Sequence, residues 1–385
     1  MNKADAVVVG GGLAGLAAAI AVAKAGLNTI HLAPQGPRDQ RTSALMLPSV
    51  AWLRQASLIG DPATLGHPLT RIRIIDATGR LLRAPETLFD SGEAGLAAFG
   101  WNFPNVLLME SFEKAGARLS NLETRAASLA ALNVDGDGVS LTLSDGSNLE
   151  ASLVIGADGK KSLVRAAAGF RAREYDFTQS ALVCDLVLGR PLGSTSVEFH
   201  YDRGPFTLVP AGDNRANLVW IDDRTVLKSA QEGGREHLRK IFLTRSQRLF
   251  GDIQLATPAH LFPLSTISVE KAGADGVVLV GEAAHAFPPI GAQGLNLGLR
   301  DVADLSDALL AAKVKPAGWA RAVSEDYASR RSGDLARTGT MVDTLFRSLL
   351  TDMLPAQFLR AGGLWALKLL PPLRKQAFRL GMGAH

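Results

Sequence analysis

Cysteine is almost absent from this sequence of 385 residues. The single cysteine, Cys184, excludes a disulfide bond within the chain and a metal cluster built on cysteines, which fits a reducing compartment. Cys184 lies in an alternating stretch that is typical of a strand, so we expect it to be a thiol of the core. We predict no metal site.

Long uncharged stretches are also scarce. Residues 6–23 form the longest one, and a signal peptide or a membrane helix is the alternative interpretation. Four glycines interrupt that stretch, and Asp5 offsets the charge of Lys3 before it. No other segment is long and apolar enough to span a bilayer. We therefore expect a cytoplasmic protein.

Acidic residues are missing from the C-terminal stretch Met353–His385. Its basic residues are Arg360, Lys368, Arg374, Lys375 and Arg379. Without them the chain is close to neutral, which argues against a nucleic-acid partner. Residues 349–385 also hold leucines, Phe358 and Trp365. Two interpretations remain open: short helices packed on the body with a basic face exposed, or contact with an anionic membrane surface.

What the sequence does have is a strand–turn–helix–strand pattern near its start. The run Val7–Val9 predicts a buried strand, Leu16–Ala25 a helix and Thr29–Leu32 a second strand. The turn between the first strand and the helix is rich in glycine. This order predicts a βαβ unit.

Three glycines in that turn have the spacing of a dinucleotide-binding motif. Gly10 allows the tight turn, Gly12 lets the backbone reach a pyrophosphate, and Gly15 lets helix and strand pack closely. The free N–H groups at the helix N-terminus favour a bound phosphate. Arg41 follows in a polar loop, where a surface charge and a phosphate contact are equally open.

The rest of the chain predicts two domains of different architecture, as its length also suggests. Expected elements before residue 168 are a helix over residues 42–53, a hairpin of Arg71–Ile75 with Gly79–Leu82, a helix over Val106–Ala115 and a hairpin of Val139–Leu143 with Leu149–Ile155. Expected elements after it are the short strands Ser180–Leu188, Ser196–His200, Phe206–Pro210 and Asn217–Ile221, followed by a charged helix over Gln231–Thr244.

A second junction of strand, loop and helix occurs more than 260 residues after the first. The strand is Val277–Val280, and the helix is expected over Leu295–Ala312. Pro288 and Pro289 stiffen the loop between them, while Gly291 and Gly294 allow backbone to approach a flat group. Two such junctions in one chain arise by chance much less often than either one alone.

In this order, these segments resemble the flavin-dependent aromatic hydroxylases of the p-hydroxybenzoate hydroxylase type, and among them most closely the ubiquinone-biosynthesis hydroxylases. The resemblance rests on residues 10–15, 41–45, 156–165 and 281–301 and covers nearly the whole chain. It implies bound FAD as the reactive group, with NAD(P)H as a transient co-substrate. It also implies a doubly wound α/β domain with an inserted, mainly antiparallel substrate domain.

The resemblance also implies roles for particular residues. The glycine turn would hold the ADP half of FAD, Asp158 and Gly159 would lie near the cofactor, and Glu282 would meet its ribityl–phosphate stretch. The flavin ring would be walled by a loop in which Pro289 is central. That loop holds Pro289, Gly291, Gln293, Gly294, Leu295 and Asn296. No side chain is predicted to be catalytic beyond this wall, because the flavin carries the reactivity.

The sequence departs from the family at two positions. Ala33 stands where the family usually has an acid that binds the adenosine ribose, and losing that contact is worth about 1–3 kcal/mol. Gln35 is a candidate substitute. Glu282 stands where aspartate is common. Both departures concern the affinity for FAD rather than the fold.

Several side chains have a functional and a structural interpretation. For His285 we favour a cap of the turn or a bond to backbone over catalysis. Arg165 and Arg300 are expected to form structural ion pairs. The candidate substrate contacts, each with ordinary core packing as the alternative, are Leu208, Pro210, Trp220, Phe287 and Pro288.

We therefore predict an FAD-dependent monooxygenase that uses NAD(P)H and O₂ to hydroxylate a phenolic ring, with a lipid-soluble, polyprenylated ubiquinone precursor as substrate. The alternatives are a soluble hydroxylase of a small aromatic acid and a flavin-free scaffold in a quinone-biosynthesis complex. The predicted domains are residues 1–70, 101–168 and 266–348 for FAD, 71–100 and 169–265 for the substrate, and 349–385 for a helical tail of basic and apolar residues. For this tail, contact with the inner face of the membrane is one of the two open interpretations.

Overall fold

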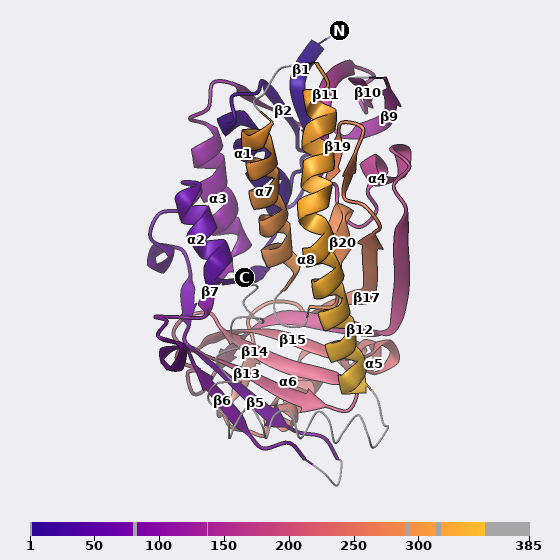
Figure 1. The fold of residues 1–385 in the computed structure, drawn as a ribbon. Helices are drawn as coiled ribbons and strands as arrows, with labels where there is room; N and C mark the ends of the chain where they lie inside the picture. Colours follow the sequence, from indigo (N-terminus) through magenta and orange to yellow (C-terminus); the bar gives the residue numbers. More distant parts are fainter. Residues whose placement is uncertain (1, 80–82, 137, 290–292, 313–316, 351–385) are drawn as a thin grey trace.

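A mixed β-sheet with a parallel centre forms the middle of the first lobe in the computed structural model (Figure 1). The structure describes residues 2–79, 83–136, 138–289, 293–312 and 317–350, with side chains as far as residue 337. The central strand β1 (Asn2–Val9) lies between β2 (Thr29–Leu32) and β11 (Asn148–Gly156), parallel to both. The sheet continues with β8 (Leu122–Arg125), β9 (Leu129–Asp135), β10 (Gly138–Leu143), β18 (Gly273–Ala274) and β19 (Val277–Leu279). Of these, β9, β10 and β18 pair antiparallel with their neighbours.

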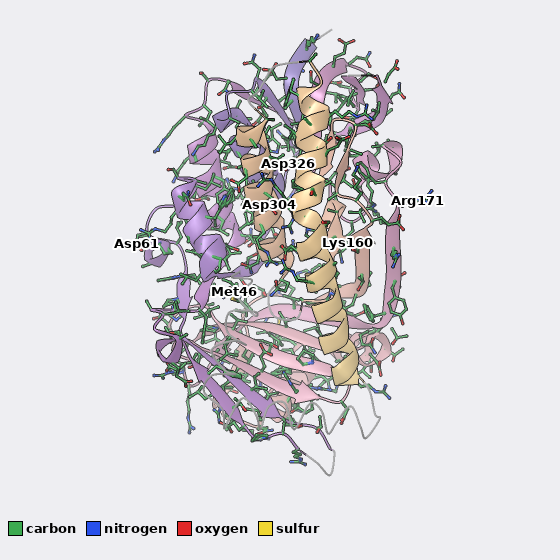
Figure 2. The ribbon with its side chains drawn as sticks, viewed as in Figure 1. Met46, Asp61, Lys160, Arg171, Asp304 and Asp326 are labelled. Atoms are coloured by element: carbon green, nitrogen blue, oxygen red, sulfur yellow. The ribbon has the colours of Figure 1, made fainter. Side chains whose placement is uncertain are left out.

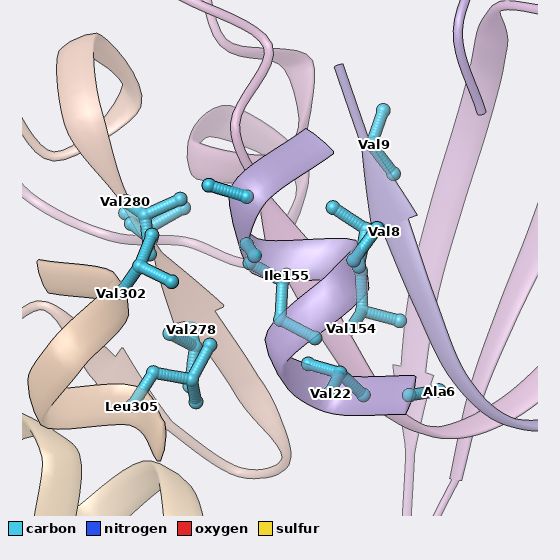
Figure 3. Packing of buried hydrophobic residues seen from close by; sticks show 14 of the residues in the cluster. Ala6, Val8, Val9, Val22, Val154, Ile155, Val278, Val280, Val302 and Leu305 are labelled. Atoms are coloured by element: carbon cyan, nitrogen blue, oxygen red, sulfur yellow. The ribbon is translucent and has the colours of Figure 1, made fainter. Parts of the chain in front are cut away.

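Helices cover this sheet. The helix α1 (Leu13–Lys24) packs against α3 (Asn105–Gly116) and α7 (Gln293–Ala311), and α7 packs against α8 (Trp319–Leu350). Figure 3 shows Val278 of β19 and Val280 beside Val302 and Leu305 of α7, while Val8 of β1 and Val154 of β11 lie nearer to Val22 of α1. Since central strands of such a sheet are buried on both faces, the continuous apolar run at Val7–Val9 follows directly.

The second lobe is a long, mainly antiparallel sheet (Figure 1). Its longest strand is β12 (Ala172–Leu188), which pairs with β15 (Arg215–Asp223) and β17 (His260–Val269). The remaining strands are β5 (Arg71–Asp76), β6 (Thr87–Asp90), β13 (Thr195–Tyr201), β14 (Gly204–Pro210), β16 (Ile253–Leu255) and β20 (His285–Ala286). One face packs against α5 (Arg224–Glu232) and α6 (Gly234–Arg245).

A small third sheet joins the lobes. It holds β3 (Thr42–Met46), β7 (Gly100–Pro104) and β4 (His67–Leu69), and α2 (Leu47–Gln55) follows β3 directly. Met46, labelled in Figure 2, marks the point where the strand becomes the helix. The shorter elements are α4 (Leu163–Ala167) and the 3₁₀ turns Pro62–Thr64, Ser91–Ala94 and Gly281–Ala283.

The predicted fold class is confirmed, and three local predictions are corrected. Residues 42–46 form a strand because β7 pairs with them, so the helix expected from residue 42 begins at Leu47. The antiparallel partner of β5 is β6 rather than residues 79–82, of which 80–82 lie outside the described residues. The single helix expected over residues 231–244 is split at Gly234, whose φ of +79° ends α5 and lets α6 begin.

Candidate functional site

The glycine turn leaves an open space at the N-terminus of α1. A Cβ on Gly10 would lie 2.1 Å from the carbonyl oxygen of Ala157, and a Cβ on Gly15 would lie 2.0 Å from that of Gly10. Both glycines are therefore required by close backbone packing. At Gly12, the N-cap of α1, a Cβ would meet no protein atom within 4 Å. Free N–H groups facing an open space fit a bound pyrophosphate.

A buried histidine, which no pattern in the sequence singled out, forms a hydrogen bond to this turn. Nε2 of His31, in β2, lies 2.9 Å from the carbonyl oxygen of Gly10. Burial lowers the pKa of His31, against a smaller opposing effect of that hydrogen bond. The ring is therefore neutral and donates from Nε2. The signal available in the sequence was a polar residue inside a short buried strand, close to the glycine turn.

Position 33 offers no acid to a ribose. Ala33 is half-buried directly after β2. A Cβ on Gly11 would lie 3.2 Å from the Cβ of Ala33. Its backbone N–H donates to the carbonyl oxygen of Arg125 over 2.9 Å. Gln35 is exposed two residues further on. The adenosine side of the site thus keeps the geometry of the strand end but lacks the usual carboxylate.

Arg41 and Glu282 approach this region from different parts of the chain. The guanidinium of Arg41 pairs with Asp39 through two contacts of 2.8 Å. The hydrogen bond to Asp39 is the largest cause of the raised pKa of Arg41, and the negative charge of Glu282 raises it further. Glu282 itself is exposed, directly after Gly281 in the turn that follows β19. Arg41 is therefore part of a charged group beside the site.

Asp158 has a structural task at its own turn. Its carboxylate accepts hydrogen bonds from the backbone N–H groups of Leu163 and Val164 over 2.7 and 3.1 Å, and from the hydroxyl of Ser162. It thereby fixes the start of α4, while Gly159 takes a φ of +80° in the turn. The predicted place of Asp158 and Gly159 near the cofactor stays a prediction.

The N-terminus of α7 is held against β3. The side chain of Asn296 donates to the carbonyl oxygen of Ala44 over 2.9 Å and accepts from the N–H of Met46 over 2.8 Å. Gln293 is buried, Leu295 is half-buried and Gly294 is exposed. Gly291 lies outside the described residues. Asn296 therefore joins the loop predicted to wall a flavin ring to a strand 250 residues away.

The loop before α7 has an apolar side. Pro288 is buried, Phe287 is half-buried, and Pro289 is exposed. The ring of Phe287 stacks on that of His285 at 6.1 Å with an interplanar angle of 8°. His285 was expected to bond to backbone or to cap the turn, but its Nε2 lies 2.6 Å from the carboxylate of Asp301. That expectation is corrected: His285 belongs to a buried side-chain network.

The expected ion pairs of the two arginines are confirmed. Arg165 pairs with Glu174 at 3.4 Å and also donates to the carbonyl oxygen of Ala283 over 2.9 Å. Arg300 pairs with Asp334 of α8 at 3.4 Å. Both side chains therefore link elements of the first lobe to their neighbours.

The second sheet has two different faces. Leu208 and Trp220 are fully buried on the face that packs against α6, where the Trp220 ring meets Phe242 at 6.2 Å. This placement argues against substrate contact by either side chain. Pro210 is also buried, and its carbonyl oxygen accepts a hydrogen bond from Asn102 of β7 over 3.0 Å.

The opposite face of this sheet is turned toward the small third sheet. Asn217 is on this face and accepts from the Asn102 side chain at 2.7 Å. Strand register places Val183, Val219 and Thr207 in one row of this face, and all three are half-buried. The row continues to Glu198 of β13. Glu198 lies 3.3 Å from Nε2 of His200, so a polar pair borders an apolar strip.

A glycine-turn βαβ unit, a distant strand–loop–helix junction beside it and an antiparallel sheet across from both fit the class of FAD-dependent monooxygenases. Comparison with known proteins gives the same class. The chain belongs to the FAD binding domain family, which matches residues 3–332. FAD is therefore its cofactor, and the open space at Gly12 fits that group.

Two relatives match the chain over nearly its full length. Ubiquinone hydroxylase UbiL of Rhodospirillum rubrum is 32% identical, and the match covers 99% of this chain and 90% of the relative. The 3-demethoxyubiquinol 3-hydroxylase of Escherichia coli is 29% identical, over 98% of this chain and 97% of the relative.

Solved structures share the fold. The p-nitrophenol 4-monooxygenase PnpA of Pseudomonas putida superimposes with a TM-score of 0.80 at 18% identity, covering 98% of this chain and 97% of the other. PqsL of Pseudomonas aeruginosa, a probable FAD-dependent monooxygenase, gives 0.79 at 21% identity, over 94% and 100%. Within the described ranges, no helix is long and apolar enough to cross a membrane.

Proposed function

We propose that this protein hydroxylates the phenolic ring of a polyprenylated ubiquinone precursor, with NAD(P)H as reductant and O₂ as oxidant. The observation that carries the proposal is the full-length similarity to a ubiquinone hydroxylase and to a 3-demethoxyubiquinol 3-hydroxylase. NAD(P)H is the reductant typical of this class.

Residues of the first lobe would hold the cofactor. The N-terminus of α1 at Gly12 would receive the pyrophosphate, and Glu282 would meet the ribityl–phosphate stretch. Pro289 and residues 293–296 would face the flavin ring. Bound FAD would supply the redox chemistry: reduction by NAD(P)H and activation of O₂, of which one oxygen atom enters the phenol ring and the other leaves as water.

The protein's own contribution is to place the ring and to exclude water. The buried Pro288 and the half-buried Phe287 give the loop an apolar surface, which favours a dry reaction space. The two bonds from Asn296 to β3 fix the start of α7, so that its backbone N–H groups keep their direction toward the site. A phenol activates its own ring, so no nucleophilic side chain is required.

The substrate is proposed to lie against the half-buried face of the second sheet. Val183 and Val219 provide an apolar surface for an aromatic ring and the first units of a prenyl tail. Glu198 and His200 provide the hydrogen-bonding groups at the edge of that surface. A phenolic hydroxyl that donates to one of them would orient the ring and make it more electron-rich.

Contact with a membrane surface is proposed for residues 349–385 on their sequence. Residues 351–385 lie outside the described part of the chain, so the proposal depends on the five basic residues, the leucines and Trp365. A hydroxylase of a polyprenylated phenol must collect it from a membrane. Each lysine or arginine near an anionic surface is worth about 1 kcal/mol. A chain ending near Leu349 should lose co-sedimentation with anionic vesicles, and equal sedimentation of both chains would contradict the proposal.

The decisive test of the function is deletion of the gene in its source organism, with the quinone intermediates identified by mass spectrometry. A polyprenylated phenol should accumulate, and its structure would name the substrate and the position attacked. The purified enzyme should then consume NAD(P)H only with that phenol and should incorporate label from ¹⁸O₂. Label from H₂¹⁸O would contradict the mechanism. Activity on a small aromatic acid alone would favour the soluble hydroxylase instead.

A further inference from the structure

One buried carboxylate connects three elements beside the cofactor site. Oδ2 of Asp301, in α7, accepts a hydrogen bond from the backbone N–H of Gly281 over 2.8 Å and lies 2.6 Å from Nε2 of His285. Its Oδ1 lies 2.7 Å from Nε of Arg331 in α8. The three side chains of this cluster are at most 2% exposed. Asp301 therefore accepts hydrogen bonds from Gly281 in the turn after β19 and from His285 of β20, and it forms an ion pair with Arg331 of α8.

The Gly281 turn, which Asp301 holds, is packed against the helices α1 and α7. Gly281 has a φ of +58°, and a Cβ there would lie 3.4 Å from the Cβ of Ala14 in the first turn of α1. A Cβ on Gly298 of α7 would lie 3.3 Å from the Cα of Gly281. The next residue in the chain is the exposed Glu282. The position of Glu282 relative to the N-terminus of α1 thus depends on how the Gly281 backbone is held.

Arg331 is the cation that faces this carboxylate in the interior. It also pairs with Asp304 at 2.7 Å and with Asp334 at 2.8 Å. Burial alone would lower the pKa of Arg331, but the surrounding carboxylates raise it. A buried charge without its partner is strongly destabilising. Arg331 of α8 is therefore paired with two carboxylates of α7, Asp301 and Asp304, and Figure 2 shows Asp304 between α7 and α8.

The helix α8 touches the same turn region at a second point. The hydroxyl of Tyr327, which is fully buried, donates to the carbonyl oxygen of Leu279 over 2.7 Å. Leu279 ends β19, two residues before Gly281. One helix thus fixes the strand through Tyr327 and the turn through the Arg331–Asp301 pair.

We propose that Asp301 is a positioning residue for FAD, which sets the Gly281–Glu282 turn against α1 and couples its placement to the docking of α8 through Arg331. The coupling has to be reciprocal: α8 docking strengthens FAD binding, and FAD binding stabilises α8. This inference concerns the binding of FAD by the protein and does not depend on the substrate proposed above.

The neighbouring carboxylate provides a matched control. Asp304 lies on the same helix and pairs with the same Arg331 at the same distance, while the bonds to Gly281 and His285 come from Asp301. Removing the charge at position 304 tests the loss of an ion pair to Arg331 alone. Removing it at position 301 also disturbs the turn.

The experiment compares the full-length Asp301→Asn and Asp304→Asn proteins, stripped of FAD and titrated with FAD while flavin fluorescence is followed. Asp301→Asn should weaken FAD binding by about tenfold or more, and Asp304→Asn by much less. The thermal midpoints of the two apo-proteins report the purely structural cost. Equal losses of FAD affinity in both variants, or no loss in Asp301→Asn, would overturn the proposal.

Hydrogen exchange over residues 319–337 provides the readout that a merely structural role would not change. Saturating FAD should slow exchange in this part of α8 in the wild type and in Asp304→Asn, but much less in Asp301→Asn. If Asp301→Asn does not fold, His285→Leu takes its place, because it removes one hydrogen-bond donor to the Asp301 carboxylate. His285→Leu should also lower the affinity for FAD. Undiminished protection of α8 together with wild-type affinity in the variants that fold would reject the coupling.

Discussion

Nε2 of His31 donates a hydrogen bond to the carbonyl oxygen of Gly10 over 2.9 Å, and the ring is only 2% exposed. The first glycine of the phosphate turn is therefore supported by a group that has to remain neutral. Its Nδ1 has no hydrogen-bond partner among the described residues, so a second proton there would be buried as an uncompensated charge.

This arrangement predicts a loss of stability in weak acid. Burial lowers the pKa of His31 in the folded protein below that of the unfolded chain, which is about 6.5. As the pH falls through about 6.5, His31 becomes protonated in the unfolded state while it stays neutral in the folded state. The free energy of unfolding therefore decreases. The decrease ends once the pH is below the folded pKa. Thermal unfolding of the apo-protein between pH 8 and 5 should be flatter in His31→Gln than in the wild type; parallel curves would contradict the prediction.

The two kinds of glycine in the turn predict two kinds of damage. In Gly15→Ala the new Cβ meets the carbonyl oxygen of Gly10, so the free energy of unfolding should fall by about 1–3 kcal/mol. In Gly12→Ala the methyl group enters open space, so the apo-protein should keep its stability while FAD binding weakens. Denaturant unfolding and FAD titration on both variants check this separation. A destabilised Gly12→Ala protein with normal FAD affinity would contradict it.

Position 33 predicts a gain of affinity. Ala33 follows β2 and lies beside Gly11, where a longer acidic side chain would reach the ribose hydroxyls. Ala33→Glu should therefore tighten FAD binding, by about 1–3 kcal/mol if both hydroxyls are bonded. Ala33→Gln, which lacks the charge, should gain less. Dissociation constants from fluorescence titration decide the matter, and an unchanged or weaker constant for Ala33→Glu would show that another group already binds the ribose.

The sequence predicted the parts of this site that depend on local pattern. The Gly10–Gly15 turn and the strand before α7 are readable because that glycine spacing and those apolar runs suit few other structures. Asp301 and Arg331 were not predicted as partners, because residues on two different helices meet only after both helices dock on the sheet. The strand at residues 42–46 was missed because its stability comes from pairing with β7 rather than from its own composition.

The substrate sheet shows a different limit. Alternation correctly predicted β5, β13, β14, β15 and the second half of β12, while β6, β16, β17 and β20 were not predicted. Alternation is also symmetric with respect to the two faces of a sheet. Trp220 and Val219 are adjacent in the chain, and only the packing of α6 shows that Trp220 is covered while Val219 faces the other lobe. Large apolar residues therefore marked the core face, and the smaller Val183 and Val219 marked the candidate substrate face.

The single cysteine predicts a simple chemical result. Cys184 is 3% exposed, and burial raises the pKa of its thiol to about 12. The thiolate that reacts with disulfide reagents is therefore scarce in the folded protein. The native enzyme should react only slowly with a disulfide reagent at pH 8, and one thiol per chain should react after unfolding in guanidinium. Rapid labelling of the native protein would contradict the buried placement.

The last prediction separates the two faces of β13. His200 lies on the half-buried face and pairs with Glu198, whereas the next residue, Tyr201, is on the other face and donates to the carbonyl oxygen of Arg245 over 2.8 Å. If the phenol lies against the half-buried face, His200→Gln should lower kcat/KM for phenol-dependent NAD(P)H oxidation by about 10²-fold or more with FAD affinity unchanged, since general-base contributions have that size. Tyr201→Phe, the matched control, should lower stability but leave kcat/KM nearly unchanged. Equal losses of kcat/KM in both variants would place the substrate elsewhere.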